Sequence, residues 1–337
     1  MDSKKKLIIV SNEKVSIFEN KFYCDNIDMK SIPEGLNENF DVLLISKKSE
    51  ITRSHVINAK NIKPASNIFN FLLGIFRTLK DKKNIYLLIS ITPYTFFAYL
   101  LLFFFRRKNY VYLRSNGFEE YKSILGVIGP FIYGIMFSIV TKKSKIITCQ
   151  KRLTMKKSEL VFPSELDENW FKNLTKPPLD KPRLLYVGRS RVEKGIFSLL
   201  KIFEKISTDV ELSVVGKKER LKEFSDKIKF VGFVNNALSL INIYDNHNIF
   251  ILPSFTEAHP KVLDESLARL RPVIIFEEIS HIIQNRKGIF VSKRNVQSLS
   301  KTIKFVISNY LNIQEDMKKN KLPTKREFFS QMVKILG

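Results

Sequence analysis

The sequence has little of what disulfide scaffolds and structural metal sites require. Only two of its 337 residues are cysteines, Cys24 and Cys149, and they form no Cys-x-x-Cys pair. The four histidines show no metal-ligand spacing. They are His55, His247, His259 and His281. The sequence therefore argues against a disulfide-rich or zinc-bound fold and favours a reducing, cytoplasmic compartment.

Several loop motifs of nucleotide-binding and hydrolytic enzymes are also missing. The chain has no GxxxxGKS or GxxxxGKT loop, no GxGxxG after an apolar run and no GxSxG elbow. These absences argue against a P-loop nucleotidase, an ordinary dinucleotide-binding domain and a serine hydrolase of the elbow type. We expect no signal peptide, because the apolar run after the basic start covers only Leu7 to Val10. This run is expected to be a first strand.

Acidic residues are scarce relative to basic ones. The chain has 33 Asp and Glu against 57 Lys and Arg, which gives a formal net charge of +24. Such a charge favours an anionic partner, namely nucleic acid, an acidic membrane surface or a phosphorylated substrate. Hydrophobic residues make up 44% of the sequence, which is enough for packed cores, and the length is comfortable for two domains.

The second half of the chain alternates short apolar runs with stretches of helical spacing. The runs are rich in Val, Ile and Leu and apolar on both faces, as strands are when helices cover both sides of a parallel sheet. Strands are expected over residues 183–188, 210–216, 228–233, 249–254, 272–277 and 288–293. Helices are expected between them, including a charged one over 219–227, and a long helix over 295–320. Six such units predict an open, doubly wound domain.

The first half shows the same alternation. Strands are expected over 6–11, 40–46, 84–91, 110–115 and 145–150, and helices over 64–80, 93–108 and 124–143. The run from Ile85 to Phe105 carries no charge over 21 residues, which is long enough to span a bilayer. We interpret it instead as a buried strand, a turn at Thr92 and Pro93, and a helix. This order continues the alternation around it, whereas a spanning helix would interrupt the sheet.

The first strand of the second half ends in GRSRVEKG, residues 188–195. Gly188 allows close approach of the backbone, and Arg189 and Lys194 supply two cations where a helix begins. Fixed donors, two cations and a helix N-terminus together suit a diphosphate. The alternative is a solvated, charged turn.

The fourth strand of the second half is followed by SFTEAHPKVLDES, residues 254–266. Glu257 should lie on the rim of the sheet, where a carboxylate can accept hydrogen bonds from sugar hydroxyls. Lys261 and Glu265 are four residues apart on the next helix and share a face. Glu265 could hold a ribose diol. The amides of residues 259–262, which are His259, Pro260, Lys261 and Val262, could face phosphate at the helix start. The alternative is a surface loop with an ion pair.

Together, GRSRVEKG and SFTEAHPKVLDESLARLRPVI resemble glycosyltransferase family 4, whose members have the two-domain GT-B fold. The usual family pattern is GR-x-x-x-EKG, followed by PS-x-x-E-x7-E-A-x-A-x-G-x-PV. The resemblance is strong over about residues 180–310. It implies that Arg189 and Lys194 bind the donor diphosphate, that Glu257 holds hydroxyls of the transferred sugar and that Glu265 holds the nucleotide ribose. Catalysis would then depend on Glu257, Arg189 and Lys194, with retention of the anomeric configuration.

The resemblance also implies a fold and its boundaries. We expect an α/β fold of GT-B type, with two Rossmann-like doubly wound domains facing a central cleft. An acceptor-binding domain is expected over 1–172, and a nucleotide-sugar-binding domain over 173–322. A helix over 323–337 would cross back to the first domain, with Pro323 at the crossing. No metal or other cofactor is expected, and the absence of any Asp-x-Asp agrees.

The sequence departs from the family pattern at several positions. Ala258 and His259 replace the usual small residue and glycine, and Leu270 replaces the glycine before Pro-Val. His259 could contact a phosphate or sugar oxygen, or be an ordinary loop histidine. No Gly-Gly loop follows the first strand. Where the fourth strand of the first half ends, LRSNG stands in place of a common histidine. This segment contains Arg114, Asn116 and Gly117, which could touch the reacting sugar or the acceptor, or form a plain turn.

The leading hypothesis is a retaining glycosyltransferase that moves a sugar from a nucleotide-diphosphate donor. Its acceptor would be a growing surface glycan, of lipopolysaccharide, capsule or O-antigen type, or a lipid-linked glycan. One alternative is a nucleotide-sugar epimerase of GT-B fold, against which the paired Arg-Lys and Glu-Glu motifs argue. Another is a basic nucleic-acid-binding protein, motivated by the charge. Against it, lysines are spread along the whole chain and no nucleic-acid-binding signature is present.

Two expected helices suggest a place at the membrane. Those over 93–108 and 124–143 are apolar over most of their length. They end in the cations Arg106, Arg107, Lys142 and Lys143. We expect a peripheral protein on the cytoplasmic face of the cell membrane, whose excess apolar surface contacts an anionic bilayer. The alternative is a pair of fully buried core helices.

Overall fold

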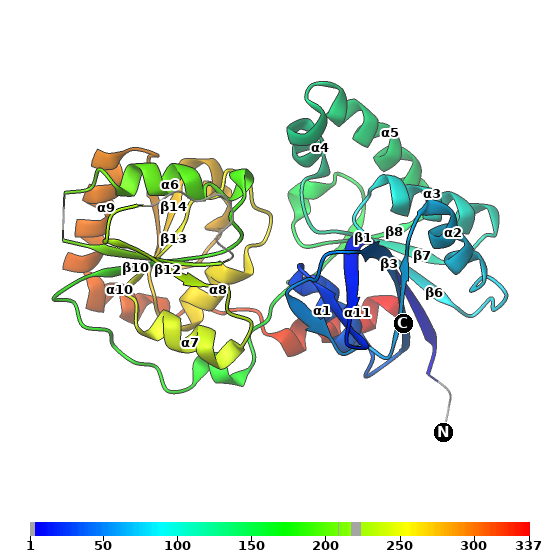
Figure 1. Cartoon of the computed structure of the whole chain (residues 1–337), viewed down its shortest axis with the longest axis horizontal. Helices are drawn as coiled ribbons and strands as arrows, with labels where there is room; N and C mark the ends of the chain where they lie inside the picture. Colours follow the sequence, from blue (N-terminus) through cyan, green and yellow to red (C-terminus); the bar gives the residue numbers. More distant parts are fainter. Residues whose placement is uncertain (1–3, 208, 217–223) are drawn as a thin grey trace. The chain divides into compact units, whose positions relative to one another are not determined.

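The computed structural model describes residues 4–207, 209–216 and 224–337 (Figure 1). Contacts divide the chain into two compact units. The N-terminal unit comprises Met1–Phe162 and Arg326–Gly337, and the C-terminal unit comprises Pro163–Lys325. The division thus falls earlier in the chain than the boundary expected at 172.

The N-terminal unit is built on one sheet. Its strands are β1 (Lys6–Phe18), β2 (Lys21–Cys24), β3 (Asp41–Ser49), β4 (His55–Ile57), β5 (Asn61–Ala65), β6 (Ile85–Ile89), β7 (Asn109–Leu113), β8 (Lys145–Thr148) and β9 (Ser158–Leu160). Seven strands run parallel in the order β5-β3-β1-β6-β7-β8-β9. The antiparallel strands β2 and β4 extend the far end of β1. The strand order reverses beside β1, as in Rossmann-like sheets.

Helices cover both faces of this sheet. They are α1 (Ile27–Leu36), α2 (Ile68–Phe76), α3 (Pro93–Phe104), α4 (Gly117–Leu125), α5 (Ile128–Lys143) and α11 (Lys325–Leu336), and a short 3-10 helix covers Lys151–Leu153. Buried residues of α2, α3 and α5 pack on alternate strand residues such as Ile8, Tyr86 and Val111. On the opposite face, the ring of Phe328 from α11 lies against Tyr112 of β7. Figure 1 shows α1 and α11 on one side of the sheet and α2, α3 and α5 on the other.

The uncharged run 85–105 forms a strand and a helix, which confirms that interpretation. Ile85–Ile89 is the buried strand β6, and Thr92 caps the N-terminus of α3, with Pro93 as its first residue. Among the described residues, no helix is both long and apolar enough to cross a membrane. The expected single helix over 124–143 was wrong at its start. Gly126, with a φ of 64°, ends α4, and α5 begins two residues later.

The C-terminal unit contains a second, fully parallel sheet. Its strands are β10 (Arg183–Val187), β11 (Glu211–Val215), β12 (Ile228–Gly232), β13 (Ile249–Leu252), β14 (Val273–Phe276) and β15 (Ile289–Ser292). Their order is β12-β11-β10-β13-β14-β15, which is that of a doubly wound sheet. All six strands expected from the sequence are confirmed.

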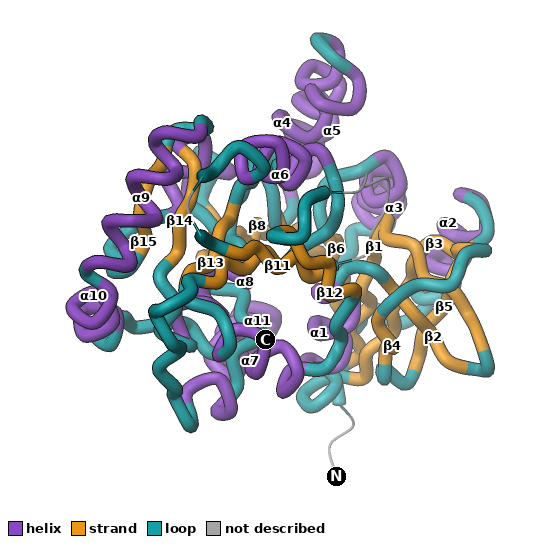
Figure 2. The backbone as a smooth tube through the Cα atoms, turned by 60° about the vertical axis from the view of Figure 1, so that its left-hand side comes forward, coloured by secondary structure: helices purple, strands orange, loops and turns teal. Residues whose placement is uncertain are grey.

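The helices of the C-terminal unit enclose this sheet. They are α6 (Ile196–Phe203), α7 (Ala237–Asp245), α8 (Lys261–Ala268), α9 (Val296–Ser308) and α10 (Tyr310–Met317), with 3-10 helices at Glu168–Phe171, Val192–Lys194 and Glu277–Ile282. Figure 2 shows α9 beside β15 at the edge of the sheet. The expected long helix over 295–320 was wrong, because Asn309 separates α9 from α10. The expected helix over 219–227 lies mainly outside the described residues, and Lys227 ends a turn directly before β12.

Candidate active site at the ends of β10 and β13

Two loops carry the site residues expected in the C-terminal unit, and their strands are neighbours. β10 pairs with β13 in parallel, with Leu184 opposite Ile249. The chain leaves β10 towards β11 on one side and returns to β13 on the other, so the strand order reverses between them. Ligands of open α/β sheets bind outside the carboxyl ends of strands at such a point. The fold therefore brings together two motifs that lie about sixty residues apart in the sequence.

The loop after β10 is held by close backbone contacts. The amide of Gly188 donates to Val215 O over 3.0 Å, and the hydroxyl of Tyr186 donates to Arg189 O over 2.9 Å. Gly195 has a φ of 67°, and a Cβ there would lie 1.9 Å from Pro253 O. Glycine is thus required at position 195 by both conformation and space. This contact seats the loop after β10 against the loop after β13.

The two loops are joined by an ion pair between predicted site residues. Lys194 Nζ lies 2.6 Å from Glu257 Oε1. Ser254 Oγ donates to the same carboxylate oxygen over 2.7 Å. The Glu257 side chain is only 9% exposed and that of Lys194 24%, so the pair is held in a partly desolvated place. Arg189, in contrast, is exposed.

Arg294, which the sequence analysis missed, clamps the loop after β13. It follows β15, and its Nη2 donates to Pro253 O over 2.9 Å, while its Nε donates to Glu278 over 2.7 Å. Its guanidinium lies 4.1 Å from the centre of the Phe255 ring. Its Nη1 is buried and has no hydrogen-bond partner among the described residues. The one available signal was that Arg294, like Arg189, directly follows a strand.

His281 adds a second support that the sequence analysis missed. Its Nε2 lies 2.9 Å from the carbonyl oxygen of Glu257. The contact ties the residues after β14 to the loop that carries the carboxylate. No motif marks this histidine, because its partner is a backbone atom. Four strand ends, those of β10, β13, β14 and β15, therefore converge on Glu257 and its neighbours.

Glu265 lies on α8 and is nearly buried. Its Oε2 is 3.2 Å from the hydroxyl oxygen of Tyr244. The same hydroxyl oxygen lies 3.1 Å from Val262 O. Burial raises the pKa of Glu265 to about 7. Lys261, one turn earlier, has its ammonium 2.6 Å from Glu165 Oε1. Glu265 is thus poised to change its charge near neutral pH.

The start of α8 holds His259 in a buried polar group. His259 Nε2 lies 3.0 Å from Asp264 Oδ2, and the other carboxylate oxygen of Asp264 pairs with Arg286. Pro260 is the N-cap residue of α8 and has no amide hydrogen. The amides left to face an anion at positions 259–262 are therefore those of His259, Lys261 and Val262. The expectation that all four amides could do so was wrong at Pro260.

The three residues expected on the reacting-sugar side stay together after β7, in the N-terminal unit. Arg114 pairs with Asp28 at 2.7 Å and lies 3.4 Å from Glu13. The side chain of Asn116 caps α4 by accepting from the amide of Phe118 over 3.2 Å. A Cβ on Gly117 would lie 2.1 Å from the ring of Tyr133. Each of the three therefore has a structural task in this unit.

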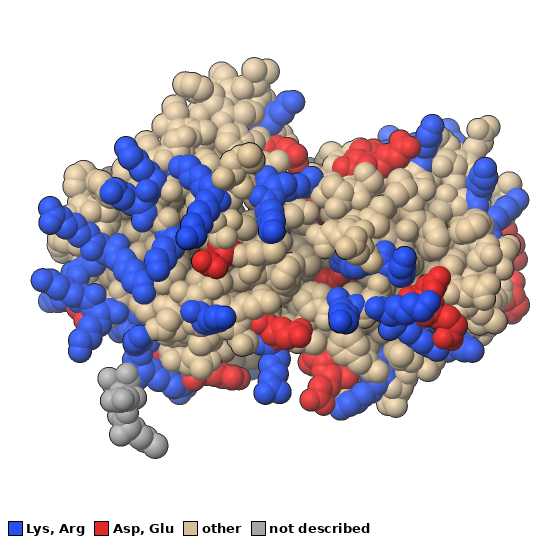
Figure 3. All heavy atoms as spheres, turned by 180° about the vertical axis from the view of Figure 1, so that it is seen from behind, with Lys and Arg blue, Asp and Glu red and all other residues tan. Residues whose placement is uncertain are grey.

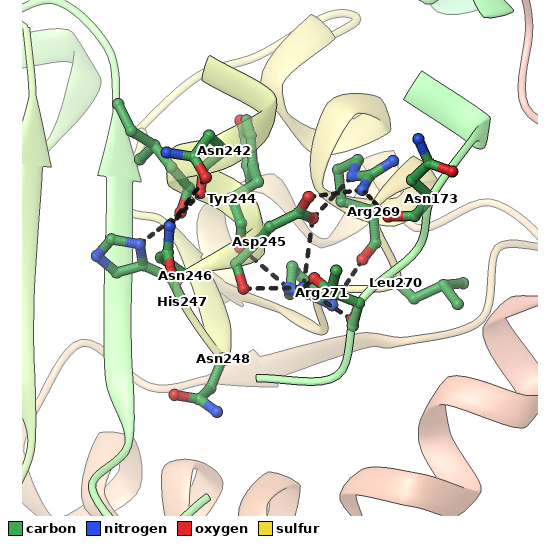
Figure 4. A network of polar contacts seen from close by, with 12 residues as sticks. Asn173, Asn242, Tyr244, Asp245, Asn246, His247, Asn248, Arg269, Leu270 and Arg271 are labelled. Atoms are coloured by element: carbon green, nitrogen blue, oxygen red, sulfur yellow. Dashed lines mark hydrogen bonds and ion pairs between the residues drawn. The ribbon is translucent and has the colours of Figure 1, made fainter. Parts of the chain in front are cut away.

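Two buried arginines flank Leu270, which replaces the glycine of the family pattern (Figure 4). Leu270 has a φ of 55°, the conformation that explains why glycine is usual at this position. Arg269 binds both carboxylate oxygens of Asp245, at 2.8 and 2.6 Å, and Arg271 donates to Tyr244 O over 2.9 Å. Arg269 also donates to the carbonyls of residues 170, 172 and 173. The turn between α8 and β14 is thus fixed by side chains.

The geometry suits an anionic ligand with hydroxyl groups. Cations lie at the end of β10, a partly buried carboxylate at the end of β13 and a second carboxylate on α8. Among residues 4–207, 209–216 and 224–337, no group of three His, Cys, Asp or Glu side chains is arranged to hold a metal ion.

Comparisons with known proteins agree with this arrangement. Residues 167–322 match the family model for Glycosyl transferases group 1. An uncharacterized glycosyltransferase of Haemophilus influenzae is 23% identical over 188 residues, which cover 49% of this chain and 53% of the relative. The putative teichuronic acid biosynthesis glycosyltransferase TuaC of Bacillus subtilis is 30% identical over 129 residues, 37% of this chain and 33% of the relative. The chain thus aligns with about half or less of these relatives.

Solved structures extend the likeness to the whole fold. HepE of Anabaena, solved in complex with UDP-glucose, superposes with a TM-score of 0.72 at 11% identity, over 98% of this chain and 99% of that one. The two units are therefore the two Rossmann-like domains of the GT-B fold, as expected from the sequence. Over residues 167–322, this chain is thus similar to the family Glycosyl transferases group 1.

Proposed function

We propose that this protein is a retaining glycosyltransferase of family 4 type, which transfers a sugar from a nucleoside-diphosphate donor. The observation that carries the proposal is the 2.6 Å contact between Lys194 and Glu257. It joins a cation expected at the diphosphate to a carboxylate expected at the sugar, at the switch point of a doubly wound sheet. The family match over residues 167–322 supports the same reaction class.

Each residue has a distinct task in this proposal. Arg189 and Lys194 bind the diphosphate and stabilise the charge that grows on it as the sugar leaves. Glu257 accepts hydrogen bonds from hydroxyls of the transferred sugar, and Glu265 accepts them from the ribose. In the free protein, Lys194 pairs with the carboxylate of Glu257. When the donor binds, the Lys194 ammonium also contacts the phosphates. No metal is required for these contacts, because the two cations come from the chain.

The acceptor is proposed to be a growing surface glycan or a lipid-linked glycan. The name of the Bacillus subtilis relative refers to teichuronic acid biosynthesis, which supports a polysaccharide product. We place the enzyme in the cytoplasm, on the inner face of the cell membrane. Both cysteines are free and buried, which fits a reducing compartment.

A panel of nucleotide sugars tests the proposal. Donor binding adds RT ln(1 + [L]/Kd) to stability, so the true donor should raise the melting temperature more than its relatives do. The donor so found is then incubated with glycan acceptors, and the anomeric configuration of the product is read by NMR. Retention is expected. Conversion of the free donor to its epimer without an acceptor would instead favour an epimerase.

Glu257→Gln tests the role of the carboxylate. The change removes the charge but keeps the size, so transfer should fall strongly while affinity for the free nucleoside diphosphate is largely kept. Glu315→Gln is the matched control, because Glu315 is an exposed carboxylate on α10 of the same unit. Full transfer activity in Glu257→Gln would refute the assignment.

A further inference from the structure

Three neighbouring helices of the N-terminal unit expose large apolar side chains on their outer faces. α2 contacts α3, and α3 contacts α5. On α2 the exposed residues include Phe69 and Phe76, and on α3 they include Phe97 and Phe104. Isolated exposed apolar residues are normal, but a contiguous face of them on a helical layer marks an interaction surface.

The exposed side chains of α5 form a stripe along the helix. They are Ile128, Phe131, Ile132, Ile135 and Ile139. Spacings of three and four residues place them on one face of the helix. The buried residues Tyr133, Met136 and Val140 form the opposite face, which packs into the core. α5 is therefore apolar on both sides, and one side has no partner within the described residues.

The turn between α4 and α5 continues the apolar stripe. Val127 is 91% exposed and the neighbouring Ile124 73%. In Figure 1 this helical hairpin projects from the rest of the N-terminal unit. Figure 3 shows, from behind, that the projecting part bears few charges, whereas Lys and Arg crowd the region below it.

The cations gather where α2, α3 and α5 end. Residues 77–83, 106–108 and 142–145 are rich in Lys and Arg and contain one acidic residue, Asp81. A pocket of about 540 Å³ lies between the ends of α3 and α5. It is lined by Phe103, Phe104, Arg106, Arg107, Asn109 and Lys143. Three cations beside two phenylalanine rings suit an anion that carries an apolar chain.

Arg106 has a left-handed backbone conformation, which glycine adopts at lower cost than other residues. It follows the end of α3 with a φ of 50°, and its amide donates to Phe103 O over 3.0 Å. A left-handed conformation is costly for a residue with a side chain, and such strain often marks a functional position. Within the described chain, no ion pair is found for Arg106, Arg107 or Lys143. The guanidinium of Arg107 donates to Leu79 O, whereas Arg106 and Lys143 are exposed, so their charges are the more accessible to an outside partner.

We propose that the outer faces of α2, α3 and α5 dock on an anionic lipid bilayer, with a lipid phosphate in the pocket of Arg106, Arg107 and Lys143. The helices would lie in the plane of the interface, with their apolar faces about 5–10 Å into the headgroup and acyl boundary. A protein partner would need acidic side chains placed opposite these cations. An anionic bilayer supplies both phosphate groups for the cations and acyl chains for the apolar stripe. The proposal does not rest on the proposed transfer reaction, since it needs no donor.

Vesicle flotation of the full chain tests the apolar stripe. Wild type should bind vesicles that mix phosphatidylglycerol with phosphatidylcholine, and bind phosphatidylcholine alone only weakly. Phe131→Asp should weaken binding to mixed vesicles by about tenfold or more, because it places a charge in the apolar face. Leu238→Asp is the control, since Leu238 is also exposed but lies on α7 of the C-terminal unit. Its binding should equal that of wild type.

A charge-reversed pair tests the phosphate pocket. Arg106→Glu with Lys143→Glu should weaken binding to mixed vesicles by at least about 25-fold, at about fivefold for each basic residue. Lys301→Glu with Lys304→Glu changes the net charge equally on exposed positions of α9 and should have little effect. Thermal unfolding of all variants checks that they remain folded.

Three outcomes would overturn the proposal. The first is equal weakening by the two charge-reversed pairs, which would mean unspecific attraction. The second is unchanged vesicle binding by Phe131→Asp. The third is a wild-type dimer in sedimentation equilibrium that Phe131→Asp dissociates, with no vesicle binding, since a second copy would then cover the face. Lack of donor binding would leave the vesicle result untouched and bear only on the proposed function.

Discussion

The contact between Lys194 and Glu257 sets how each residue of the proposed donor site should respond to substitution. Lys194 has a carboxylate partner in the free protein, whereas Arg189 is exposed. Removing Lys194 therefore does two things. It deletes a cation from the site, and it leaves the partly buried carboxylate of Glu257 without that partner, close to where the diphosphate is expected. Both effects oppose binding of an anion.

Lys194→Ala should weaken nucleoside-diphosphate binding by about 3 kcal/mol and Arg189→Ala by about 1.5 kcal/mol, the upper and lower ends of the range for charge-assisted hydrogen bonds. Isothermal titration calorimetry with the nucleoside diphosphate measures both. Lys201→Ala removes a similar charge from an exposed position on α6 and should leave the affinity unchanged. Equal affinity in wild type, Lys194→Ala and Arg189→Ala would refute the diphosphate assignment.

Glu265 makes the proposed donor site sensitive to pH. Burial raises its pKa to about 7, and a ribose diol donates hydrogen bonds best to the ionised form. Nucleotide affinity should therefore rise as the pH rises through about 7. Calorimetry of wild type and Glu265→Gln across this range gives the test. Protonation of the nucleotide changes both affinities equally, so it does not affect their ratio. A ratio of wild-type to Glu265→Gln affinity that is independent of pH would contradict the prediction.

The same group should act on stability with the opposite sign. The folded protein raises the pKa of Glu265 above its usual 4.5, so folding favours the protonated form. Its contribution to the free energy of unfolding is most favourable below about 4.5 and is lost as the pH rises through about 7. Ligand-free protein should thus lose stability over the window in which nucleotide affinity increases, and Glu265→Gln should remove both trends.

At the scale of elements, the turn between α8 and β14 shows how side chains hold a costly backbone conformation. Leu270 has a φ of 55°, while Arg269 and Arg271 on either side are buried and hydrogen-bonded. The strain of the left-handed conformation is of order 1–2 kcal/mol for a residue with a Cβ. The hydrogen bonds of the two arginines offset it. The glycine of the family pattern would avoid the strain and would not need them.

Comparing Leu270→Gly with Leu270→Ala isolates this strain. Both variants lose the leucine side chain, but only alanine keeps the cost of the positive φ. Glycine should therefore be more stable than alanine by about 0.5–1 kcal/mol, the reverse of their usual order. Urea unfolding followed by fluorescence of Trp170, the one tryptophan of the chain, reports on the C-terminal unit. Higher stability of the alanine variant would contradict the prediction.

The elements that could be predicted from sequence were those with a regular local pattern. The six strands of the C-terminal unit are short, apolar and separated by helical spacing, and all are present. The hairpin of β1 and β2 was missed because its turn at Glu19 and Asn20 reaches positive φ without a glycine. α1 was missed because Pro33 lies inside it. The break at Asn309 carries neither glycine nor proline.

The candidate site was predictable where motifs follow single strands and not where contacts join different loops. Arg189, Lys194 and Glu257 could be proposed as site residues because each follows a strand at a characteristic spacing. That Lys194 pairs with Glu257 depends on β10 and β13 being neighbours, which is a property of the sheet order. Arg294 and His281 support the site through backbone carbonyls, and a carbonyl leaves no trace in the sequence.

At the scale of the whole molecule, the end of the chain packs into the first unit. α11 follows the C-terminal unit in sequence, yet Arg326–Gly337 clusters with Met1–Phe162. Phe328, Met332 and Leu336 are buried, and the hydroxyl of Tyr110 lies 3.4 Å from Leu336 O. The last helix thus completes the core on one face of the first sheet. Disrupting α11 should therefore lower the stability of the N-terminal unit, although α11 follows the C-terminal unit in sequence.

Phe328→Ala should destabilise the N-terminal unit by about 3–5 kcal/mol, because it leaves a cavity against Tyr112 in a packed core. Unfolding in urea should then show two transitions. Circular dichroism should report an early loss of structure, whereas Trp170 fluorescence should keep the wild-type midpoint, since Trp170 belongs to the C-terminal unit. Nucleotide binding should keep it too, because the proposed donor site lies in that unit. Lys334→Ala, at an exposed position of the same helix, should change neither signal. If Phe328→Ala shifts the Trp170 transition as far as the circular dichroism signal, the two units unfold as one cooperative body, and the last helix stabilises the whole chain rather than its first unit.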